Sequence, residues 1–409
     1  MSEINVSEIT TERLNEEMFP ETTEFNEKVE TPLTRAKLDA IPIADPSMTT
    51  DQLRQICVDY LQLSVSFQWT TDRYISFNGK PERTFYKGKL YGGIPYINTA
   101  SGNLYRILEY YDEKTGHLDT SFFKDNPLLF GTACSGTASM ALYRVVNSAE
   151  LSWTHSMNVA HGFIPVGDYK YDHSLRQIWE TGPDGKRIYF YNLKHICRDN
   201  GEQVMFESYA KALPADCFSS NGHVRLAVEN PVVVRLEDGT IDGENSYAVL
   251  GEQGLYTKDA RHKRTTSDGT AYLIRGTDRF CPTFKQLFDA GYVVHTFAEF
   301  LGTKPVERGT VSIGIAEKAV TAEALCAATL KANFPISDIF TTVCDANGNE
   351  IYRHVYRSHP HFVRSIPMTK ALCREELAAL ANGENTVEMK AQLANGEKLC
   401  CYSGTLLAD

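Results

Sequence analysis

The spacing of apolar residues changes along the chain, and this change limits the folds that it can adopt. Over residues 49–67 the apolar residues recur about every 3.6 positions, which predicts a helix with Thr50 or Asp51 as its N-cap. Residues 222–254 instead contain two β-rich runs with turn residues between them, which predicts a hairpin. Helices in the first part of the chain and a sheet after them predict an α+β fold.

Three segments between these regions have weaker patterns. Residues 101–112 predict a second helix, capped by Ser101. The alternation in "KRIYFYNLKHI", residues 186–196, predicts a strand, and residues 202–216 predict a short helix or turn that leads into strands. The cysteine discussed below lies on a further predicted helix between the first two of these segments.

The two ends of the chain differ from its middle. Residues 1–48 are rich in Glu and Thr and have only isolated apolar positions, which favours an acidic arm that is extended or partly disordered. Residues 306–409 contain β-patterned runs separated by turn sequences such as "DANGNE", with one short helix at 373–381. We therefore expect a main domain over residues 49–305, followed by a small β-sandwich-like domain.

Charge and hydropathy exclude some classes of partner. The 409-residue chain has a formal net charge of −11, and its longest basic run is "RHKR" at 261–264, so we expect no binding of nucleic acid. No apolar run approaches the roughly 20 residues that span a bilayer. The N-terminus is acidic and polar, unlike a secretory signal. The sequence as it stands predicts a cytoplasmic protein, or an extracellular one if an export signal was removed.

The cysteines and histidines do not have the spacing of a metal site. The ten cysteines are scattered without a C-x-x-C pair, which favours reduced and mostly buried thiols. The densest of the histidine clusters is "HPH" at 359–361, which has no Cys, His or Asp partners at zinc-site intervals. We expect neither a metal nor another cofactor.

One cysteine has an unusual setting. "FGTACSGTASMALYRV", residues 130–145, places Cys134 among small residues at the start of an apolar, helix-forming run, with Thr132 available as a cap. A thiol at a helix N-terminus is more easily ionised, because the free backbone N–H groups and the helix dipole stabilise the thiolate. Cys134 is therefore a candidate nucleophile, and the alternative is a buried core cysteine.

A cysteine nucleophile needs a base and a group that orients the base. His223 follows Gly222 where a strand begins, and the alternation after it places the imidazole opposite the large apolar side chains. The run "SYAVLGEQG" then ends with Glu252 and Gln253 on the next strand. Either residue could point toward the imidazole, because a one-residue change of register exchanges the faces.

The segments "ACSG", "LPADCFSSNGHVRLAV" and "DGTIDGENSYAVLGEQG", in this order, resemble the papain-like cysteine peptidases and amidases of the NlpC and CHAP types. The resemblance covers roughly residues 85–260. It implies a papain-like domain in which N-terminal helices pack on an antiparallel sheet. It also implies Cys134 as nucleophile, His223 as base and Glu252 as the orienting residue, with Gln253 as the alternative.

The resemblance extends to the residues around the site. "KLYGGIPY", residues 89–96, is similar to an upstream segment of the family and implies that Tyr91 or Tyr96 lies beside the nucleophile. Together with Ser135, these tyrosines are the candidates for contact with the substrate or the oxyanion. Asp216 matches the aspartate of the turn before the histidine.

Three features depart from the family pattern. Ala133 stands where the family usually has Asp, and Ala215 stands where it usually has Gly before Asp216. The hairpin after His223 is also longer than in compact members. These departures affect the inference of substrate more than that of the catalytic residues, because none of the changed residues is a reacting group.

The resemblance implies hydrolysis of amide or peptide bonds in bacterial cell-wall-type peptides, with a peptide or cell-wall fragment as the bound partner. Three alternatives remain open. The protein could be a papain-fold binding protein without catalysis, with a partner on its C-terminal β domain, or an acyltransferase that uses the same Cys–His pair. Cys134 could also be a redox thiol, although no resolving cysteine is near it in sequence.

Overall fold

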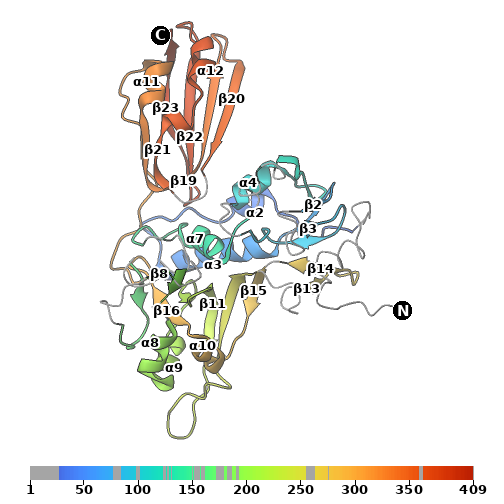
Figure 1. Cartoon of the computed structure of the whole chain (residues 1–409), viewed down its shortest axis with the longest axis vertical. Coiled ribbons are helices and arrows are strands. Elements are labelled where there is room, and N and C mark those ends of the chain that lie inside the picture. Colours follow the sequence, from blue (N-terminus) through green and yellow to red (C-terminus); the bar gives the residue numbers. More distant parts are fainter. Residues whose placement is uncertain are drawn as a thin grey trace. The chain divides into compact units, whose positions relative to one another are not determined.

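A computed structural model describes residues 27–76, 84–97, 102–122, 126, 129, 131–149, 151, 157, 162–171, 179–181, 187–189, 193–254, 263–274, 276–358 and 363–408. The chain divides into two compact units (Figure 1). The first consists of Met1–Pro42, Thr49–Leu142 and Ser148–Lys304, and the second of Ile43–Met48, Tyr143–Asn147 and Pro305–Asp409. Helices and sheets both contribute to the first unit, so the predicted α+β class is confirmed.

Helix α3 (Thr50–Ser66) forms where the apolar spacing predicts it. Its N-cap is Thr49, not Thr50 or Asp51, because Thr49 and Gln52 form a reciprocal capping box. The Thr49 side chain accepts from the Gln52 backbone N–H, and the Gln52 side chain accepts from the Thr49 N–H at 2.9 Å. The side chains on its buried face include Leu53, Ile56, Cys57, Tyr60 and Leu61.

The next predicted helix is shorter than expected. Helix α4 (Leu104–Glu109) begins after Asn103, whose side chain accepts from the Arg106 N–H at 3.1 Å. Asn103 is therefore the N-cap, and the proposed cap Ser101 lies outside the described residues. Asparagine is as favourable as serine at an N-cap. Ser101 and Asn103 were therefore equally good candidates for the start of this helix.

The strand predicted over residues 186–196 is wrong in its second half. Strand β9 (Arg187–Tyr189) pairs with β8 (Trp179–Thr181), but helix α8 (Leu193–Asn200) follows. The buried side chains of α8 are Leu193, Ile196 and Cys197, which have helical spacing. Helix α9 (Glu202–Ala210) forms within the segment predicted as a short helix or turn.

One six-stranded sheet of the first unit has the strand order β15-β12-β11-β10-β16-β7, and its neighbouring strands are antiparallel. The strands are β15 (Gly276–Phe280), β12 (Tyr247–Gln253), β11 (Val224–Val232), β10 (Cys217–Ser219), β16 (Val293–Thr296) and β7 (Ile164–Pro165). Helices α8, α9 and α10 (Phe284–Ala290) lie beside it (Figure 1). Phe206, Phe218 and Phe284 belong to the hydrophobic core between these helices and the sheet.

A second sheet of the first unit has the order β13-β14-β4-β1-β6-β5 and mixes parallel and antiparallel pairs. Its strands are β13 (Lys263–Thr265), β14 (Ala271–Ile274), β4 (Tyr91–Gly92), β1 (Gln68–Thr71), β6 (His117–Leu118) and β5 (Tyr111–Asp112), and the short pair β2 (Ile75–Ser76) and β3 (Thr84–Phe85) stands apart. A Cβ atom on Gly92 would collide with the Ile274 side chain. Glycine at this position therefore allows close packing of β4 and β14.

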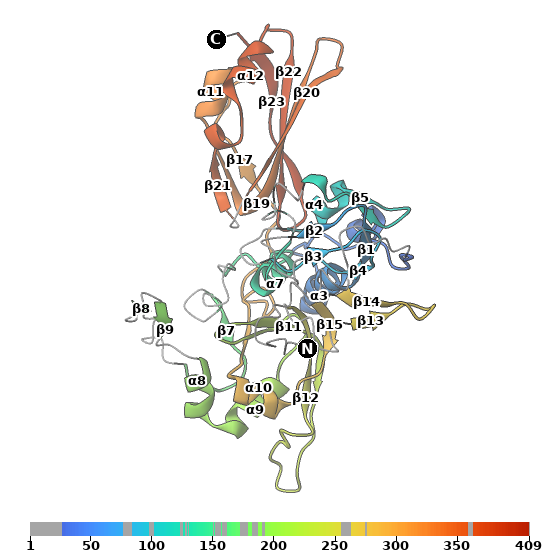
Figure 2. The ribbon, with the colours of Figure 1, turned by 45° about the vertical axis from the view of Figure 1, so that its right-hand side comes forward.

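Helix α7 (Cys134–Leu142) contacts both helix α3 and the sheet that contains β11 and β12 (Figure 2). It packs against α3 on one side and against β11 and β12 on another. All of its residues are buried. Thr132 is not its N-cap, because the helix begins at Cys134 and the Thr132 hydroxyl donates to the Ala133 carbonyl at 3.4 Å. The predicted helix is thus present, but the proposed cap is one residue too early.

Part of the predicted N-terminal arm is ordered. Residues 33–41 contain helix α2 (Arg35–Asp39), and the side chains of Leu33 and Leu38 are fully buried. The Leu33 backbone N–H donates to the Tyr111 hydroxyl at 3.2 Å, which attaches this segment to β5. The isolated apolar residues of the arm are therefore anchors, so the expectation of an extended or disordered arm is wrong for this stretch.

The second unit is built around the long strand β19 (Thr329–Cys344), which pairs with four other strands. They are β17 (Val311–Ser312), β20 (Glu350–Arg357), β21 (Val363–Pro367) and β22 (Thr386–Leu393), and β23 (Lys398–Leu407) and β18 (Ala319–Thr321) continue the sheet. Helix α12 (Arg374–Ala379) and the short 3-10 turn Met368–Lys370 precede β22. Helix α12 was predicted, whereas α11 (Ala322–Ala327) was not.

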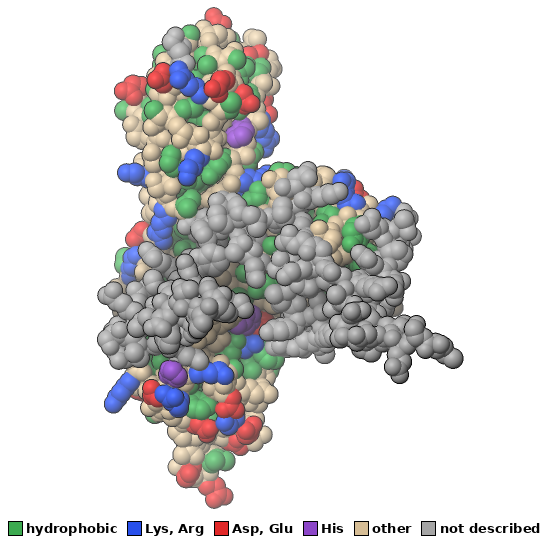
Figure 3. Space-filling view, viewed as in Figure 1, with side chains coloured by type: hydrophobic (Ala, Val, Ile, Leu, Met, Phe, Trp, Pro, Cys, Tyr) green, Lys and Arg blue, Asp and Glu red, His purple; other side chains and the backbone are tan. Residues whose placement is uncertain are grey.

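No described helix is long and apolar enough to cross a membrane. Figure 3 shows acidic and basic side chains interspersed over the visible face of the second unit.

Candidate active site

His223 is held at the end of a tight turn. Strands β10 and β11 pair with Ser219 opposite Val224, and the Ser220 N–H donates to the His223 carbonyl at 2.9 Å. Asn221 and Gly222 form the tip of this turn, and the Asn221 side chain accepts from the Leu193 N–H at 2.9 Å. The His223 backbone is therefore fixed from two sides, while 20% of its side chain remains exposed.

Glu252 is the residue that contacts the imidazole. The His223 Nε2–H donates to the Glu252 Oε2 at 2.7 Å, and only 3% of the Glu252 side chain is exposed. The next residue, Gln253, is buried elsewhere and donates from Nε2 to the Ile94 carbonyl. Adjacent residues of a strand face opposite sides of its sheet, so the register of β11 and β12 selects Glu252 and leaves Gln253 outside this contact.

Cys134 completes the cluster. Its side chain hydrogen-bonds His223, and the residue is 5% exposed. Because Nε2 of the imidazole already faces Glu252, Nδ1 is the ring nitrogen that remains for the sulfur. A thiol from α7, an imidazole from the turn before β11 and a carboxylate from β12 are thus brought together from three elements.

The charges of the cluster support one another. Burial alone would lower the pKa of His223, but hydrogen bonds to Cys134 and Glu252 raise it to about 9. Burial would likewise raise the pKa of Glu252, but the hydrogen bond from His223 and the charge of Arg225 hold it well below its usual range. At neutral pH the pair is therefore an imidazolium and a carboxylate.

The position of Cys134 in its helix adds a further charge effect. It is the first residue of α7, where backbone N–H groups have no partner within the helix and the positive end of the dipole lies. This setting stabilises a thiolate next to an imidazolium. The positive end of the helix dipole also favours an oxygen that develops negative charge beside the sulfur.

The tyrosine-containing segment "YGGIPY" runs beside the start of α7. The Thr132 N–H donates to the Pro95 carbonyl at 2.9 Å, and Tyr96 forms a parallel bridge with Thr132. A Cβ atom on Gly131 would collide with the Pro95 carbonyl, so glycine is needed for this close approach. Tyr96 is therefore paired with Thr132, the residue two positions before Cys134.

Tyr91 has a different environment. Its hydroxyl accepts from the Tyr86 N–H at 2.8 Å. Its ring packs against Trp69 and Phe85, with ring centres 4.9 Å apart in both pairs. These contacts make Tyr91 part of the aromatic core around β4. Of the two candidate tyrosines, Tyr96 is therefore the one whose backbone lies next to the residues before Cys134.

Ser135 and Asp216 are both buried. Ser135 is the second residue of α7, directly after Cys134. Asp216 accepts from Arg54 of α3 at 2.7 Å and from the Leu213 N–H at 2.8 Å. Burial raises the pKa of Asp216, against the charge of Arg54. These contacts place Asp216 in the support of the turn before β10.

The departure at Ala215 has a physical consequence. Among the described non-glycine residues, only Ala215 has a positive φ, 68°. This left-handed conformation costs an L-residue roughly 1–2 kcal/mol, and glycine adopts it freely. The Ala215 N–H nevertheless donates to the Ala227 carbonyl of β11 at 2.7 Å, so the turn keeps the shape that a glycine would favour.

Sequence reasoning missed one residue of the cluster. The Arg225 Nε–H donates to the same Glu252 oxygen as His223, at 2.6 Å. The sequence held one signal for it, because Arg225 is two residues after His223 and so shares its face of the strand. A charged residue on a strand is usually exposed to solvent. The alternation alone did not show whether Arg225 is exposed or paired with a buried carboxylate.

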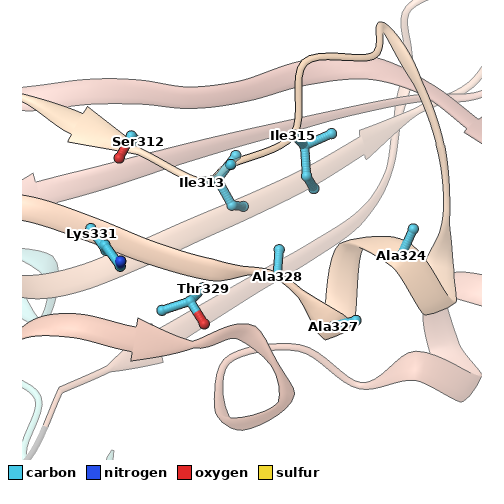
Figure 4. Close-up of a pocket in the computed structure, with 9 residues that line it drawn as sticks. Ser312, Ile313, Ile315, Ala324, Ala327, Ala328, Thr329 and Lys331 are labelled. Carbon is cyan, nitrogen blue, oxygen red and sulfur yellow. The ribbon is translucent and has the colours of Figure 1, made fainter.

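The second unit has a separate groove of about 620 Å³ (Figure 4). It lies between β17, α11 and the start of β19, and its lining residues are Ser312, Ile313, Gly314, Ile315, Ala324, Ala327, Ala328, Thr329 and Lys331. Lys331 is the charged member of this lining. The groove therefore offers apolar contact but no acid, base and nucleophile together. In the part of the chain that the structure describes, no cluster of His, Cys, Asp and Glu is suited to a metal ion.

No protein-family model matches the chain, and neither does any curated protein. Its function is therefore inferred from the geometry of the site and from the sequence resemblance.

Proposed function

We propose that the protein is a papain-like cysteine hydrolase that cleaves amide or peptide bonds. The observation that supports this proposal is the chain of hydrogen bonds from Cys134 through His223 to Glu252, at the start of a buried helix. Nucleophile, base and orienting acceptor are thereby in contact before a substrate arrives. The order of the three residues in the sequence also fits the family that the chain resembles.

The reaction follows from the charges of these groups. The Cys134 thiolate attacks the carbonyl carbon of the substrate, and the carbonyl oxygen becomes an oxyanion near the Cys134 N–H. The His223 imidazolium gives its proton to the leaving nitrogen, so the C–N bond breaks and a thioester remains. Water then attacks the thioester while neutral His223 takes its proton. The acid product leaves, and the proton stays on the Cys134–His223 pair.

The proposed substrate is a bacterial cell-wall-type peptide, and this part of the proposal depends on the sequence resemblance. Ala133 and Ala215 depart from the family pattern near the nucleophile and near the base, so the particular scissile bond is left to experiment. Transfer of the acyl group to an amine would use the same thioester. The two outcomes differ only in whether water or an amine reaches it.

The first experiment measures the nucleophile without assuming a substrate. Native protein is alkylated with iodoacetamide from pH 4 to pH 9, and peptide mapping gives the rate at each cysteine for the wild type and for His223→Ala. We expect rapid alkylation of Cys134 below pH 7 in the wild type and its loss in the variant. Alkylation of Cys134 no faster than that of the exposed Cys281, and independent of His223, would overturn the proposal.

The second experiment addresses the reaction. Wild type and Cys134→Ser are incubated with a set of cell-wall peptides, with and without a primary amine, and the products are identified by mass spectrometry. Free acid products from the wild type alone support hydrolysis. Amide products that appear only with the added amine assign acyl transfer instead. An activated Cys134 that converts none of these peptides would contradict the substrate class and leave the cysteine chemistry in place.

A further inference from the structure

We propose that Arg225 is a positioning residue of this site, which keeps Glu252 ionised and aimed at His223 and so sets the acid limit of Cys134 reactivity. The inference rests on the proposed function and adds to it a residue that acts through the orienting carboxylate. Arg225 is on β11, two residues after His223, and Glu252 is on the neighbouring strand β12.

One carboxylate oxygen serves both donors. The Glu252 Oε2 accepts from the His223 Nε2–H at 2.7 Å and from the Arg225 Nε–H at 2.6 Å. The Glu252 side chain is 3% exposed and that of Arg225 is 12% exposed, so water screens the contact little. A buried carboxylate is costly unless a cation and hydrogen bonds compensate for its lost hydration. Arg225 provides this compensation with a permanent charge, whereas His223 must change its charge during the reaction.

Arg225 is itself fixed in direction. Its guanidinium carbon lies 4.6 Å from the centre of the Tyr292 ring and 4.9 Å from that of the Phe280 ring. Phe280 ends β15 and Tyr292 precedes β16, and these two strands lie on either side of β11 in the strand order. Both rings hold the guanidinium by cation–π contact. Lysine has the charge but neither the planar group nor a donor at the Nε position.

The direction of the effect follows from the groups that face Glu252. They are His223 and Arg225 on the β11 side, Cys134 on α7 through His223, and Tyr292 before β16. Without Arg225 the burial of Glu252 remains, but one of its two cationic partners is lost, so its pKa rises. Below the new pKa the neutral carboxyl no longer stabilises the imidazolium. As the pH is lowered, the thiolate–imidazolium pair is therefore lost at a higher pH in a variant without Arg225 than in the wild type.

The test compares the pH profile of Cys134 alkylation in the wild type, Arg225→Met and Arg225→Lys. We expect the acid midpoint of Arg225→Met to rise by about one pH unit or more, so that the rate at pH values below both midpoints falls about 10-fold. At pH 8, where Glu252 is ionised in both proteins, the rates should agree within about 3-fold. Arg225→Lys should recover part of the shift, because it restores the charge but not the geometry.

A matched control separates this role from a loss of folding. Arg357 and Asp338 form a similarly buried ion pair in the second unit, at 3.2 Å and with side chains 8% and 2% exposed. Arg357→Met should lower the melting temperature without moving the alkylation midpoint. If Arg225→Met does not fold, Arg225→Gln removes the same charge with a smaller change and should show the same shift.

The outcomes that overturn the inference are distinct from those that overturn the proposed function. A wild type with an activated Cys134, together with an Arg225→Met midpoint equal to that of the wild type, would refute the role of Arg225 alone. An equal loss of rate at every pH, accompanied by a lower melting temperature, would show a merely structural role. A wild-type Cys134 without any activation would refute the proposed function and this inference together.

Discussion

Two cysteine–histidine pairs lie at the sheet that contains β10, β11 and β16, and their histidines differ in charge. His223 contacts Cys134 and Glu252, and its pKa is raised to about 9. His295 on β16 lies opposite Cys217 on β10, and burial lowers its pKa to about 3. Burial also raises the pKa of the Cys217 thiol well above its usual range. Histidine is thus charged in one place and neutral in the other.

The difference comes from the partners of each imidazole. The Nδ1–H of His295 donates to the Ser219 hydroxyl at 3.3 Å, because that hydroxyl gives its own hydrogen to the Met157 carbonyl. Its Nε2 is buried without a hydrogen-bond partner. Among the described residues no carboxylate charge acts on it, and Cys217 is on a strand, not at a helix N-terminus. Proximity of cysteine and histidine is therefore not enough; a buried anion and a helix dipole give the first pair its charge.

The largest expected effect separates the two histidines by reactivity. His223→Ala should lower the rate of Cys134 alkylation at pH 6 about 100-fold, because a thiol of ordinary pKa is ionised to well under one per cent at that pH. His295→Leu should leave the rate within about 2-fold, since it lies outside the cluster. Peptide mapping of each variant gives both rates. Equal effects of the two substitutions would mean that the sheet as a whole, and not the His223 contact, controls Cys134.

The second effect separates the histidines by the pH dependence of stability. The unfolded chain takes up a proton at a His295 pKa near 6.5, whereas the folded chain does so only near 3. Stability is therefore lost as the pH falls below 6.5, by about 2 kcal/mol between pH 7 and pH 5. His295→Leu should remove this loss. Urea unfolding of both proteins at the two pH values measures it, and an equal loss in wild type and variant would show that His295 is protonated in the folded state.

The third effect tests which of two adjacent residues orients His223. Glu252→Gln keeps a hydrogen-bond acceptor but removes the charge, so the pKa of His223 should fall and alkylation of Cys134 at pH 6 should slow about 10-fold. Gln253→Leu is the matched control, because Gln253 donates to the Ile94 carbonyl and not to the imidazole. It should change the pH profile little. A larger effect of Gln253→Leu than of Glu252→Gln would contradict the pairing.

The sequence indicated Cys134, His223 and Glu252 as candidates, but not Arg225 and not the geometry of the cluster. Cys134 and His223 were recognisable because each lies at the beginning of an element with clear periodicity. The choice between Glu252 and Gln253 depended on the register of β11 and β12. The pairing of these strands is irregular between Ala227 and Glu229. Such irregularities change which face a residue occupies, and local sequence does not specify them.

The fold shows the same division between local and long-range information. The helix over 49–67 was predictable because its apolar face and its cap are both local. The ordered stretch of residues 33–41 was not, because the buried Leu33 is attached by a hydrogen bond from its backbone N–H to Tyr111, 78 positions later. The same holds for Arg225, whose aromatic neighbours come from two distant strands.

The smallest effect concerns the turn before β10. This strand lies between β11, which follows His223, and β16, which carries His295. Ala215→Gly should raise the free energy of unfolding by about 0.5–1 kcal/mol, because glycine relieves the positive φ of 68° at the cost of a more flexible unfolded chain. Ala227→Gly, at the paired position of β11, should instead destabilise by about 1 kcal/mol. Urea unfolding compares them. A destabilising Ala215→Gly would show that the turn gains more from the alanine methyl group, which is fully buried, than it loses in backbone strain.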